Sequence, residues 1–389
     1  MLRRGSEAPL RSEAPPDWER RRRVAERYFV PWVEEVMPLS GRTVLEYGSG
    51  NGAVTAAFAP RSARYIGIDI DPDQIGAARR LLAARQTDAT LLAAPPAQIL
   101  AETAAFRREV DVFLCYAVLE HMTVDERLSL LELAREVVRD DGIIVVVETP
   151  NRLTPWDYHT SQLPFLNQLP EDLALRYFHR SERTEFVEAL EAAGDNAKLR
   201  ETFARWGRGM SYHEFELVFG DLSRHVVASS WEPTLLQERS IYREELALQR
   251  VLDQVRPDLP PPFSRYWLDL ILVARPLPQP RRFLRPWALR TTGSISATYD
   301  ASEVVHLQAN DAVLAVDLPN SSDRLVVGIH TEGTPGRISV RQATTGTERQ
   351  AVTRGPGPEF ADLRFPGAVH RYEIVLNESG WINFVGYDG

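Results

Sequence analysis

Three glycines stand close together near residue 50, directly after a short apolar run. In VLEYGSGNGAVT the run that begins at Val44 leads into Gly48, Gly50 and Gly52, and a short helical segment follows and stops at Pro60. Glycine adopts backbone conformations that other residues avoid, and it lets a ligand approach main-chain N–H groups at the start of a helix. This segment therefore predicts a loop that holds a ligand.

An acidic residue, Asp69, ends the next apolar run, RYIGIDI, about 20 residues after the first glycine. A carboxylate at that position can accept hydrogen bonds from both hydroxyls of a ribose. Two cofactor classes fit these features, because Gly48, Gly50 and Ala53 also satisfy the GxGxxA pattern of nicotinamide dinucleotide sites. Glu46 favours the other class, since a carboxylate just before the first glycine is awkward beside a pyrophosphate but suits the ammonium of a sulfonium cofactor's methionine portion.

The scarcity of lysine removes further alternatives. Of the 45 basic residues, only Lys198 is a lysine. A phosphate-binding loop of the GxxxxGK[ST] type needs a lysine after its glycines, and none stands there. A dehydrogenase pair of the Tyr-x-x-x-Lys type cannot be built either, because Gly194 occupies the position where the tyrosine would be needed.

Short apolar runs alternate with helical stretches around these residues. The runs expected to form strands are 43–48, 64–70, 90–94, 110–118 and 142–149, with 224–231 and 266–274 completing the sheet later in the chain. Such alternation predicts a parallel sheet built from βαβ units. The clearest helix is expected over 123–139, where Thr123 and Glu126 form a capping box and Asp141-Gly142 ends the helix. Another helix is expected between Asp17 and Met37.

The chain has 389 residues, which exceeds the size at which a single core usually stops growing, so two domains are expected. The predicted parts are a flexible leader (1–16), an α/β domain (17–274) with a helical lid insertion at about 150–262, a proline-rich linker (275–286) and an all-β domain (287–389). The last part reads as β-sandwich-like, because short alternating runs are separated by turn residues. The expected fold is a Rossmann-like, seven-stranded, mostly parallel sheet followed by this all-β domain.

Three segments resemble the successive cofactor motifs of class I S-adenosylmethionine-dependent methyltransferases of the small-molecule type: VLEYGSGNG, YIGIDID and DVFLCYAVLEHM. The resemblance is close from Thr43 to Asn151 and looser to Ala274. It implies S-adenosylmethionine as the cofactor, with Asp69 on the ribose and Ile70 beside the adenine. The cofactor-binding residues that it implies are Glu46, Gly48, Ser49, Gly50, Asn51, Gly52, Asp69, Ile70, Ala94, Tyr116, Ala117 and His121.

One departure concerns the adenine. Many members of the family carry an acidic residue just after the third strand, whereas this chain reads LLAAPPAQ. Ala93 and Ala94 offer only backbone atoms at that place, and Gln98 is the replacement that the sequence suggests.

Methyl transfer to an alcohol needs a dry pocket that aligns the acceptor and a group that removes its proton. The candidate bases are His159 and His213, and the expected acceptor wall consists of Trp156, Tyr158, Phe165 and Tyr212. An alternative uses a divalent ion held by Asp157, His159 and His213. No compact ligand motif is present, so no metal site is expected.

The predicted reaction moves a methyl group to a hydroxyl, or less readily to an amine, of a polar small molecule or sugar, as in natural-product or surface-glycan pathways. The alternatives are an NAD(P)-dependent oxidoreductase and a non-catalytic cofactor-binding scaffold. For the C-terminal domain two interpretations remain: glycan binding through aromatic side chains such as Trp381 and Tyr387, or a structural or dimerising role in a homodimer.

Composition limits the partners. The sequence is 44% hydrophobic and 25% charged, and no apolar run approaches the roughly 20 residues that a bilayer demands. A net charge of −9 argues against nucleic acid or anionic lipid as a partner. The single cysteine, Cys115, cannot form an intramolecular disulfide, which agrees with the expected cytoplasmic location.

Overall fold

The computed structural model describes residues 16–236, 238–239, 242–280, 284–286, 290–291, 295–299, 305–309, 313–331, 337–352, 357–376 and 380–388. The expected leader lies outside these residues except for Pro16, which begins a helix. The chain divides into two compact units. Unit 1 comprises Met1–Val118 and Glu132–Val145, and unit 2 comprises Leu119–Leu131 and Val146–Gly389. The domain boundaries expected from the sequence stay predictions.

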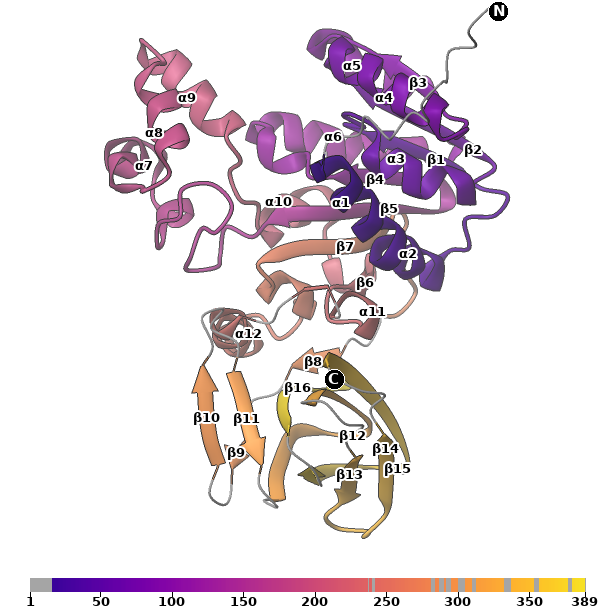
Figure 1. The fold of residues 1–389 in the computed structure, drawn as a ribbon, viewed down its shortest axis with the longest axis vertical. Helices are drawn as coiled ribbons and strands as arrows, with labels where there is room; N and C mark the ends of the chain where they lie inside the picture. Colours follow the sequence, from indigo (N-terminus) through magenta and orange to yellow (C-terminus); the bar gives the residue numbers. More distant parts are fainter. Residues whose placement is uncertain are drawn as a thin grey trace, which may run out of the picture. The chain divides into compact units, whose positions relative to one another are not determined.

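The α/β part contains a seven-stranded sheet of order β3-β2-β1-β4-β5-β7-β6 (Figure 1). Its strands are β1 (Thr43–Tyr47), β2 (Arg64–Asp69), β3 (Thr90–Ala93), β4 (Val110–Tyr116), β5 (Val138–Pro150), β6 (Val226–Ser229) and β7 (Trp267–Val273). β1 pairs in parallel with β2 and β4, β2 pairs in parallel with β3, and β6 pairs antiparallel with β7. The predicted fold class is therefore confirmed.

The strand order creates a switch point between β1 and β4. From β1 the chain moves outward through β2 to β3, and it then returns to place β4 on the other side of β1. In open α/β sheets, ligands bind outside the carboxyl ends of the strands at such a point. Every residue of β4 is buried, as expected for a central parallel strand.

Helices connect these strands: α3 (Ala53–Phe58), α4 (Pro72–Ala84), α5 (Pro96–Ala104) and α6 (Val124–Val137). The predicted capping box is present, because the Thr123 N–H donates to Glu126 Oε2 at 2.8 Å and the Glu126 N–H donates to Thr123 Oγ1 at 3.4 Å. The predicted helix end at Asp141-Gly142 is wrong, since α6 ends at Val137 and β5 follows at once. Gly142 serves close packing instead: a Cβ there would lie 2.9 Å from the Asp111 carbonyl oxygen.

The helix expected between Asp17 and Met37 is present as α1 (Pro16–Val24), a π-helical stretch (Ala25–Phe29) and α2 (Val30–Val36). Trp18 of α1 is fully buried against α3 and α4, and α1 lies beside α3 (Figure 1). Its indole N–H donates to the carbonyl oxygen of Asn51 at 2.9 Å. The N-terminal helix thus holds the middle of the glycine-rich loop in place.

In unit 2, helices occupy the region where the lid insertion was expected: α7 (Glu171–Tyr177), α8 (Thr184–Glu191), α9 (Asn196–Arg205), α10 (Tyr212–Phe219), α11 (Pro233–Leu236) and α12 (Arg243–Val255). Helices α7, α8 and α9 share a small apolar core that includes Ala174, Phe186 and Phe203. None of the helices in the described part of the chain is long and apolar enough to cross a membrane.

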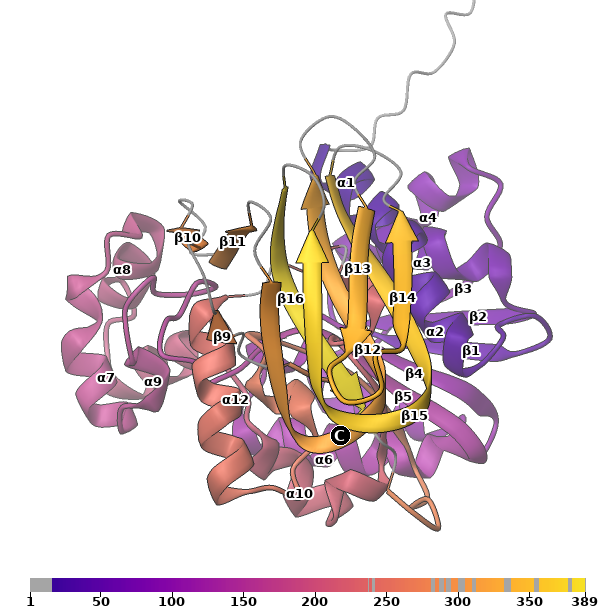
Figure 2. The ribbon, with the colours of Figure 1, turned by 90° about the horizontal axis from the view of Figure 1, so that it is seen from below.

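The C-terminal region is all-β, as predicted. Its strands are β8 (Leu284–Pro286), β9 (Arg290–Thr291), β10 (Ile295–Tyr299), β11 (Val305–Ala309), β12 (Val313–Thr331), β13 (Arg337–Gln342), β14 (Glu348–Val352), β15 (Gly357–Leu376) and β16 (Gly380–Asp388). They form one antiparallel sheet of order β10-β11-β16-β12-β15-β13-β14, with β8 on β16 and β9 on β12. Figure 2 shows the long strands β12 and β15 side by side.

The long strand β12 contributes to the core on both sides of an irregularity. Its register with β15 shifts between Asp317 and Ser322, yet Val316 before the shift and Val327 after it belong to the same buried cluster. A single sheet therefore curves over one core. Tyr387 is buried in that cluster, so the expectation that it is exposed for sugar stacking is wrong. The side chain of Trp381 lies outside the described residues.

A buried ion pair supports the aromatic residues near Tyr158. Arg265 donates to Glu245 of α12 at 2.7 Å, and both side chains are almost fully buried. The Glu245 carboxylate also accepts the backbone N–H groups of Tyr242 and Tyr266, at 2.9 Å and 2.6 Å. Those two tyrosine rings contact Tyr158, with centroid distances of 4.9 Å and 5.1 Å. The carboxylate of Glu245 thus holds in place the two tyrosines that pack against Tyr158.

Replacing this carboxylate by an amide should be costly, because it removes the counter-charge that pairs directly with the buried guanidinium of Arg265. We expect Glu245→Gln to lower the free energy of unfolding by about 3 kcal/mol. Urea unfolding measures the loss, with Glu188→Gln on the exposed face of α8 as the matched control. Equal stability of the two variants would contradict this account of the ion pair.

Candidate functional site

The loop after β1 needs glycine at its three predicted positions. Gly48, Gly50 and Gly52 have φ angles of +78°, +50° and +76°, in the left-handed region that disfavours other residues. A Cβ on Gly48 would lie 2.5 Å from Val118 Cγ2, and one on Gly52 would lie 3.0 Å from Ala78 Cβ. A Cβ on Gly50 would meet no described atom within 4 Å. Packing explains two of the glycines, and Gly50 borders open space.

The carboxylate of Asp69 holds this loop against the end of β2. Its Oδ2 accepts the N–H of Gly50 at 2.7 Å, and its Oδ1 accepts the N–H of Asp71 at 2.9 Å. Each carboxylate oxygen has two lone pairs, so each can accept a further hydrogen bond from a ribose hydroxyl. The backbone oxygen of Asp69 accepts the N–H of Ala94 at 3.0 Å, which joins the end of β3 to the same place.

Glu46 is more deeply buried than the sequence suggested. Its Oε2 accepts the hydroxyl groups of Thr55 at 2.6 Å and Tyr65 at 2.8 Å. Burial raises the pKa of Glu46 to about 7, although the hydrogen bonds from Thr55 and Tyr65 oppose that rise. The sequence could not predict these partners, because α3 and β2 supply them. Glu46 thus joins β1 to α3 and β2 beneath the glycine loop.

The remaining cofactor candidates of unit 1 lie along the same sheet edge. Ser49, Ala94 and Tyr116 are buried, and Ile70 is 52% exposed directly after Asp69. Ala117, just beyond the end of β4, has a φ angle of +54°, which is rare for a residue other than glycine. Such strained residues gather at functional sites. Gln98 is exposed at the start of α5.

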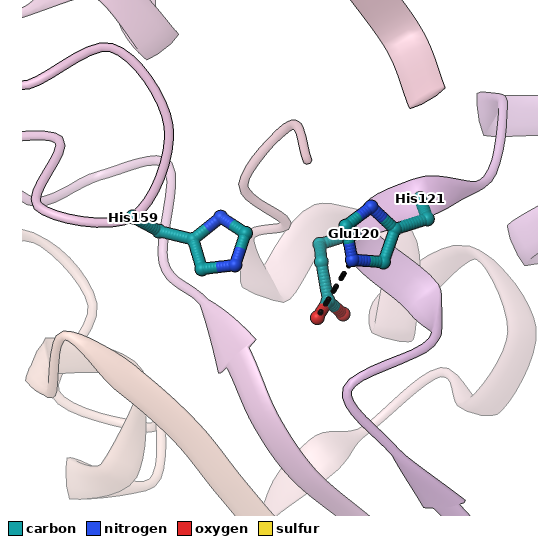
Figure 3. A group of neighbouring side chains, drawn as sticks. All are labelled: Glu120, His121 and His159. Atoms are coloured by element: carbon teal, nitrogen blue, oxygen red, sulfur yellow. Dashed lines mark ion pairs between the residues drawn. The ribbon is translucent and has the colours of Figure 1, made fainter. Parts of the chain in front are cut away.

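His121 belongs to unit 2, unlike the other cofactor candidates. It ends a short 3₁₀ turn, Leu119–His121. Its Nδ1 lies 2.8 Å from the carbonyl oxygen of Arg205, and its Nε2 lies 3.7 Å from Glu120 Oε1. The structure therefore groups His121 with Glu120 and His159, whose ring centroid lies 5.9 Å from that of His121 (Figure 3).

The two histidines border a cavity of about 470 Å³ in unit 2. Its lining consists of His121, His159, Arg183, Lys198, Glu201, Thr202, Arg205 and Trp206. The cations have partners of their own: Lys198 pairs with Glu201 at 3.2 Å, Arg205 pairs with Glu126, and Arg183 donates to the backbone oxygens of His159 and Thr160. The cavity is thus lined largely by charged side chains, several of which already pair with one another or with neighbouring groups.

The second candidate base, His213, has different surroundings. It is exposed at the start of α10, its Nδ1 lies 3.0 Å from Ser211 Oγ, and its ring stacks on Tyr212 at 3.9 Å. It does not line the cavity that His159 borders. The carboxylate of Asp157 accepts hydrogen bonds from Thr160 and Ser161 in the turn that follows it. The metal alternative built on Asp157, His159 and His213 therefore has no support in this geometry.

The expected acceptor wall is divided. Trp156 and Tyr158 contact each other at a centroid distance of 6.1 Å, and Phe165 is 53% exposed. Tyr212 packs instead with His213 and the guanidinium of Arg256. Glu120 was missed as a site residue, although its position beside His121 in the LEHM run was a usable signal.

Comparison with known proteins agrees with this geometry. Residues 45–144 match the family model described as a methyltransferase domain. This part of the chain is thus similar to a methyltransferase domain, and the match supports S-adenosylmethionine as its cofactor.

The chain is similar to ubiquinone biosynthesis O-methyltransferase of Pseudomonas paraeruginosa (strain DSM 24068 / PA7), with 33% identity over 125 residues, which are 32% of this chain and 50% of the relative. It is also similar to an uncharacterized methyltransferase of Mycobacteroides abscessus, with 36% identity over 117 residues, or 30% of this chain and 42% of the relative. The chain thus spans half or less of these relatives.

Among solved structures, the chain is similar to magnesium protoporphyrin IX methyltransferase from Synechocystis PCC 6803 with bound S-adenosylmethionine. The TM-score is 0.28 and the identity is 19%, over 34% of this chain and 60% of that one. The fold assignment rests on the strand order rather than on this likeness.

Substitution can separate the role of Gly48 in packing from the role of Gly50 beside open space. We expect Gly50→Ala to fold with a loss of about 1 kcal/mol, because only the left-handed backbone is strained, yet to weaken S-adenosylhomocysteine binding since the new methyl group enters open space. Gly48→Ala should lose about 3 kcal/mol, because it also clashes with Val118. Urea unfolding and calorimetry measure both effects. Unchanged binding by Gly50→Ala would count against a ligand at this loop.

The raised pKa of Glu46 should appear as a pH dependence of stability. The folded state binds the proton more tightly than the unfolded state, so wild-type stability falls as the pH rises from about 4.5 to 7. Glu46→Gln lacks this titration and can still accept from Thr55 and Tyr65. We expect its unfolding free energy to rise relative to wild type by about 3 kcal/mol between pH 4.5 and pH 8. Denaturant unfolding at several pH values tests this expectation, with the exposed Glu102→Gln as the control. A difference in unfolding free energy between Glu46→Gln and wild type that stays the same at every pH would refute it.

Proposed function

We propose that this protein is an S-adenosylmethionine-dependent methyltransferase that methylates a hydroxyl group of a polar small molecule. The observation that carries the proposal is the Asp69–Gly50 contact at the β1/β4 switch point, inside the segment that matches the methyltransferase family model. Open space at Gly50 and two carboxylate oxygens beside it suit a ribose with two hydroxyls. The residues present at Gly50 and Asp69 therefore fit the ribose of S-adenosylmethionine.

In this proposal Asp69 binds the ribose hydroxyls and Ile70 covers one face of the adenine. Exposed apolar area at Ile70, directly beyond the carboxylate, supports that role. Ser49, Asn51, Gly52 and the main chain near Ala94 complete the cradle, while Tyr116 and Ala117 close the methionine side. Glu46, with its own hydroxyl partners, acts on the methionine ammonium through its charge.

The acceptor is placed beside His159. The Nδ1 of His159 lies 2.9 Å from Thr160 Oγ1, whose own proton goes to the backbone oxygen of Gly207. Nδ1 therefore carries the hydrogen of the neutral ring, and Nε2 carries the lone pair that takes up the acceptor's hydroxyl proton. S-adenosylmethionine supplies an activated methyl group, whose carbon bonds to the acceptor oxygen as the carbon–sulfur bond breaks and sulfur keeps the electron pair.

Two observations favour a polar acceptor with a hydroxyl group. The relative from Pseudomonas paraeruginosa is named as an O-methyltransferase. The cavity beside His159 is lined by Arg183, Lys198 and Arg205, which suit hydroxyl, carboxylate or phosphate groups. A sugar or sugar phosphate is one acceptor of this kind.

Calorimetry should separate this function from that of a nicotinamide enzyme. We expect wild-type protein to bind S-adenosylhomocysteine and not NADH. Asp69→Asn should weaken S-adenosylhomocysteine binding by about tenfold, since one hydrogen bond to an anion is worth about 1.5–3 kcal/mol. Asp73→Asn, exposed on the first turn of α4, is the matched control and should bind as wild type does. Binding of NADH in place of S-adenosylhomocysteine would overturn the proposal and favour an oxidoreductase.

A further inference from the structure

Glu120, His121 and His159 converge in unit 2, although 38 residues separate the two histidines. One ligand-type atom from each side chain lies within 4.8 Å of the others. Figure 3 shows the two imidazole rings and the carboxylate turned toward a common centre. Glu120 is fully buried, whereas both histidines border the cavity, so the group is closed on one side and open on the other.

The hydrogen bonds of the two rings fix their tautomers. His121 Nδ1 faces the carbonyl oxygen of Arg205, which only accepts, so this nitrogen must carry a hydrogen. His159 Nδ1 donates to Thr160 Oγ1, as argued above. In both neutral rings the lone pair is therefore on Nε2. Metal-bound histidines show this pattern, because a bond from the other ring nitrogen orients the ring and raises its basicity.

The His159 ring is also held by packing. Gly207 has a φ angle of +114°, and a Cβ on it would lie 2.7 Å from His159 Cε1. On another side Trp267 contacts the same ring edge-to-face at 5.8 Å. A ring fixed by a bare backbone, an indole and a hydrogen bond has little freedom to leave the group. Such rigidity is what a metal site requires of its ligands.

The electrostatics of the group favour a cation at its centre. A carboxylate oxygen and two imidazole nitrogens lie within 4.8 Å of one another, and a positive charge between them lowers the repulsion of their electron pairs. The guanidinium of Arg127 also acts electrostatically on Glu120. A proton can supply the central charge by forming an imidazolium, and the 3.7 Å separation of His121 from Glu120 fits that form. A divalent ion satisfies all three groups at once. Proton and ion therefore compete for the same place.

We propose that Glu120, His121 and His159 bind a divalent first-row transition ion, of which Zn²⁺ is the probe of choice. Two imidazoles and one carboxylate form a common ligand set for such ions, whereas Mg²⁺ and Ca²⁺ prefer oxygen ligands. Three protein ligands leave at least one coordination position, which opens to the cavity. This set shares only His159 with the Asp157, His159 and His213 alternative that the sequence suggested.

The role of the ion rests on the proposed function. An acceptor hydroxyl that binds the open position has a lowered pKa, as water does on zinc. With the ion bound, the Nε2 lone pair of His159 is a ligand, which replaces its role as the base, and the hydroxyl proton passes to solvent in the cavity. The new carbon–oxygen bond forms and the carbon–sulfur bond breaks as before. The cations Arg183, Lys198 and Arg205 suit an acceptor that brings further negative charge to this cavity.

Metal binding by the full chain without a histidine tag tests the proposal. After treatment with a chelator and its removal, we expect the protein to bind one Zn²⁺ by calorimetry. Co²⁺ in its place should give the intense visible absorption of a four- or five-coordinate ion. His121→Gln, His159→Gln and Glu120→Gln should each weaken Zn²⁺ binding by about 100-fold or more. His179→Gln, an exposed histidine outside the group, is the matched control and should bind as wild type does.

Circular dichroism and S-adenosylhomocysteine binding are measured on every variant. Circular dichroism shows whether each variant folds, and retained S-adenosylhomocysteine binding by Glu120→Gln and His159→Gln with lost Zn²⁺ binding supports the site. Zn²⁺ binding that is equally tight in wild type and in the His121→Gln/His159→Gln double variant overturns it, as does a Co²⁺ spectrum of the hydrated ion. Failure to bind S-adenosylhomocysteine while Zn²⁺ binds at these residues overturns the proposed function and leaves the metal site standing.

Discussion

The carboxylate of Asp69 is the interaction on which the rest of the cofactor region depends. It accepts N–H groups from Gly50, in the loop after β1, and from Asp71, in the loop after β2. The N–H of Gly48 also donates to the backbone oxygen of Ile68. The glycine loop is therefore fixed to β2 by main chain and side chain together. A loop shaped in advance loses little conformational freedom when a ligand binds, which favours affinity.

The sequence predicted the elements of this region because their causes are local. Buried parallel strands are continuous apolar runs, and left-handed turns require glycine, so β1 to β5 and the loop at Gly48 could be placed from residue types alone. The end of α6 was misplaced for a different reason. Asp141-Gly142 is a common turn signal, but Gly142 is needed where the chain closely approaches the Asp111 carbonyl. Tyr387 was misjudged because alternation in a strand does not say which face is covered.

From the sequence, the candidate acceptor site could be placed only in the stretch that follows the fifth strand. His159 and His213 looked equivalent in the sequence, since each stands in an aromatic stretch beyond the fifth strand. Only the fold distinguishes them: the ring of His159 meets His121 across 38 residues of chain, whereas His213 is exposed beside Tyr212. Glu120 stands next to His121 in the LEHM run, but its convergence with His159 left no periodic signal in the sequence.

Two buried glutamates show how surroundings decide what a carboxyl group can do. Glu46 meets the hydroxyl groups of Thr55 and Tyr65, which can donate to it in either protonation state, so burial simply raises its pKa to about 7. Glu120 meets imidazole rings whose Nδ1 hydrogens are directed elsewhere, and their remaining nitrogens offer lone pairs. Glu46 is therefore satisfied in either protonation state and joins β1, α3 and β2. At Glu120, by contrast, a proton or a metal ion at the centre of the group would meet the carboxylate and both imidazole nitrogens at once.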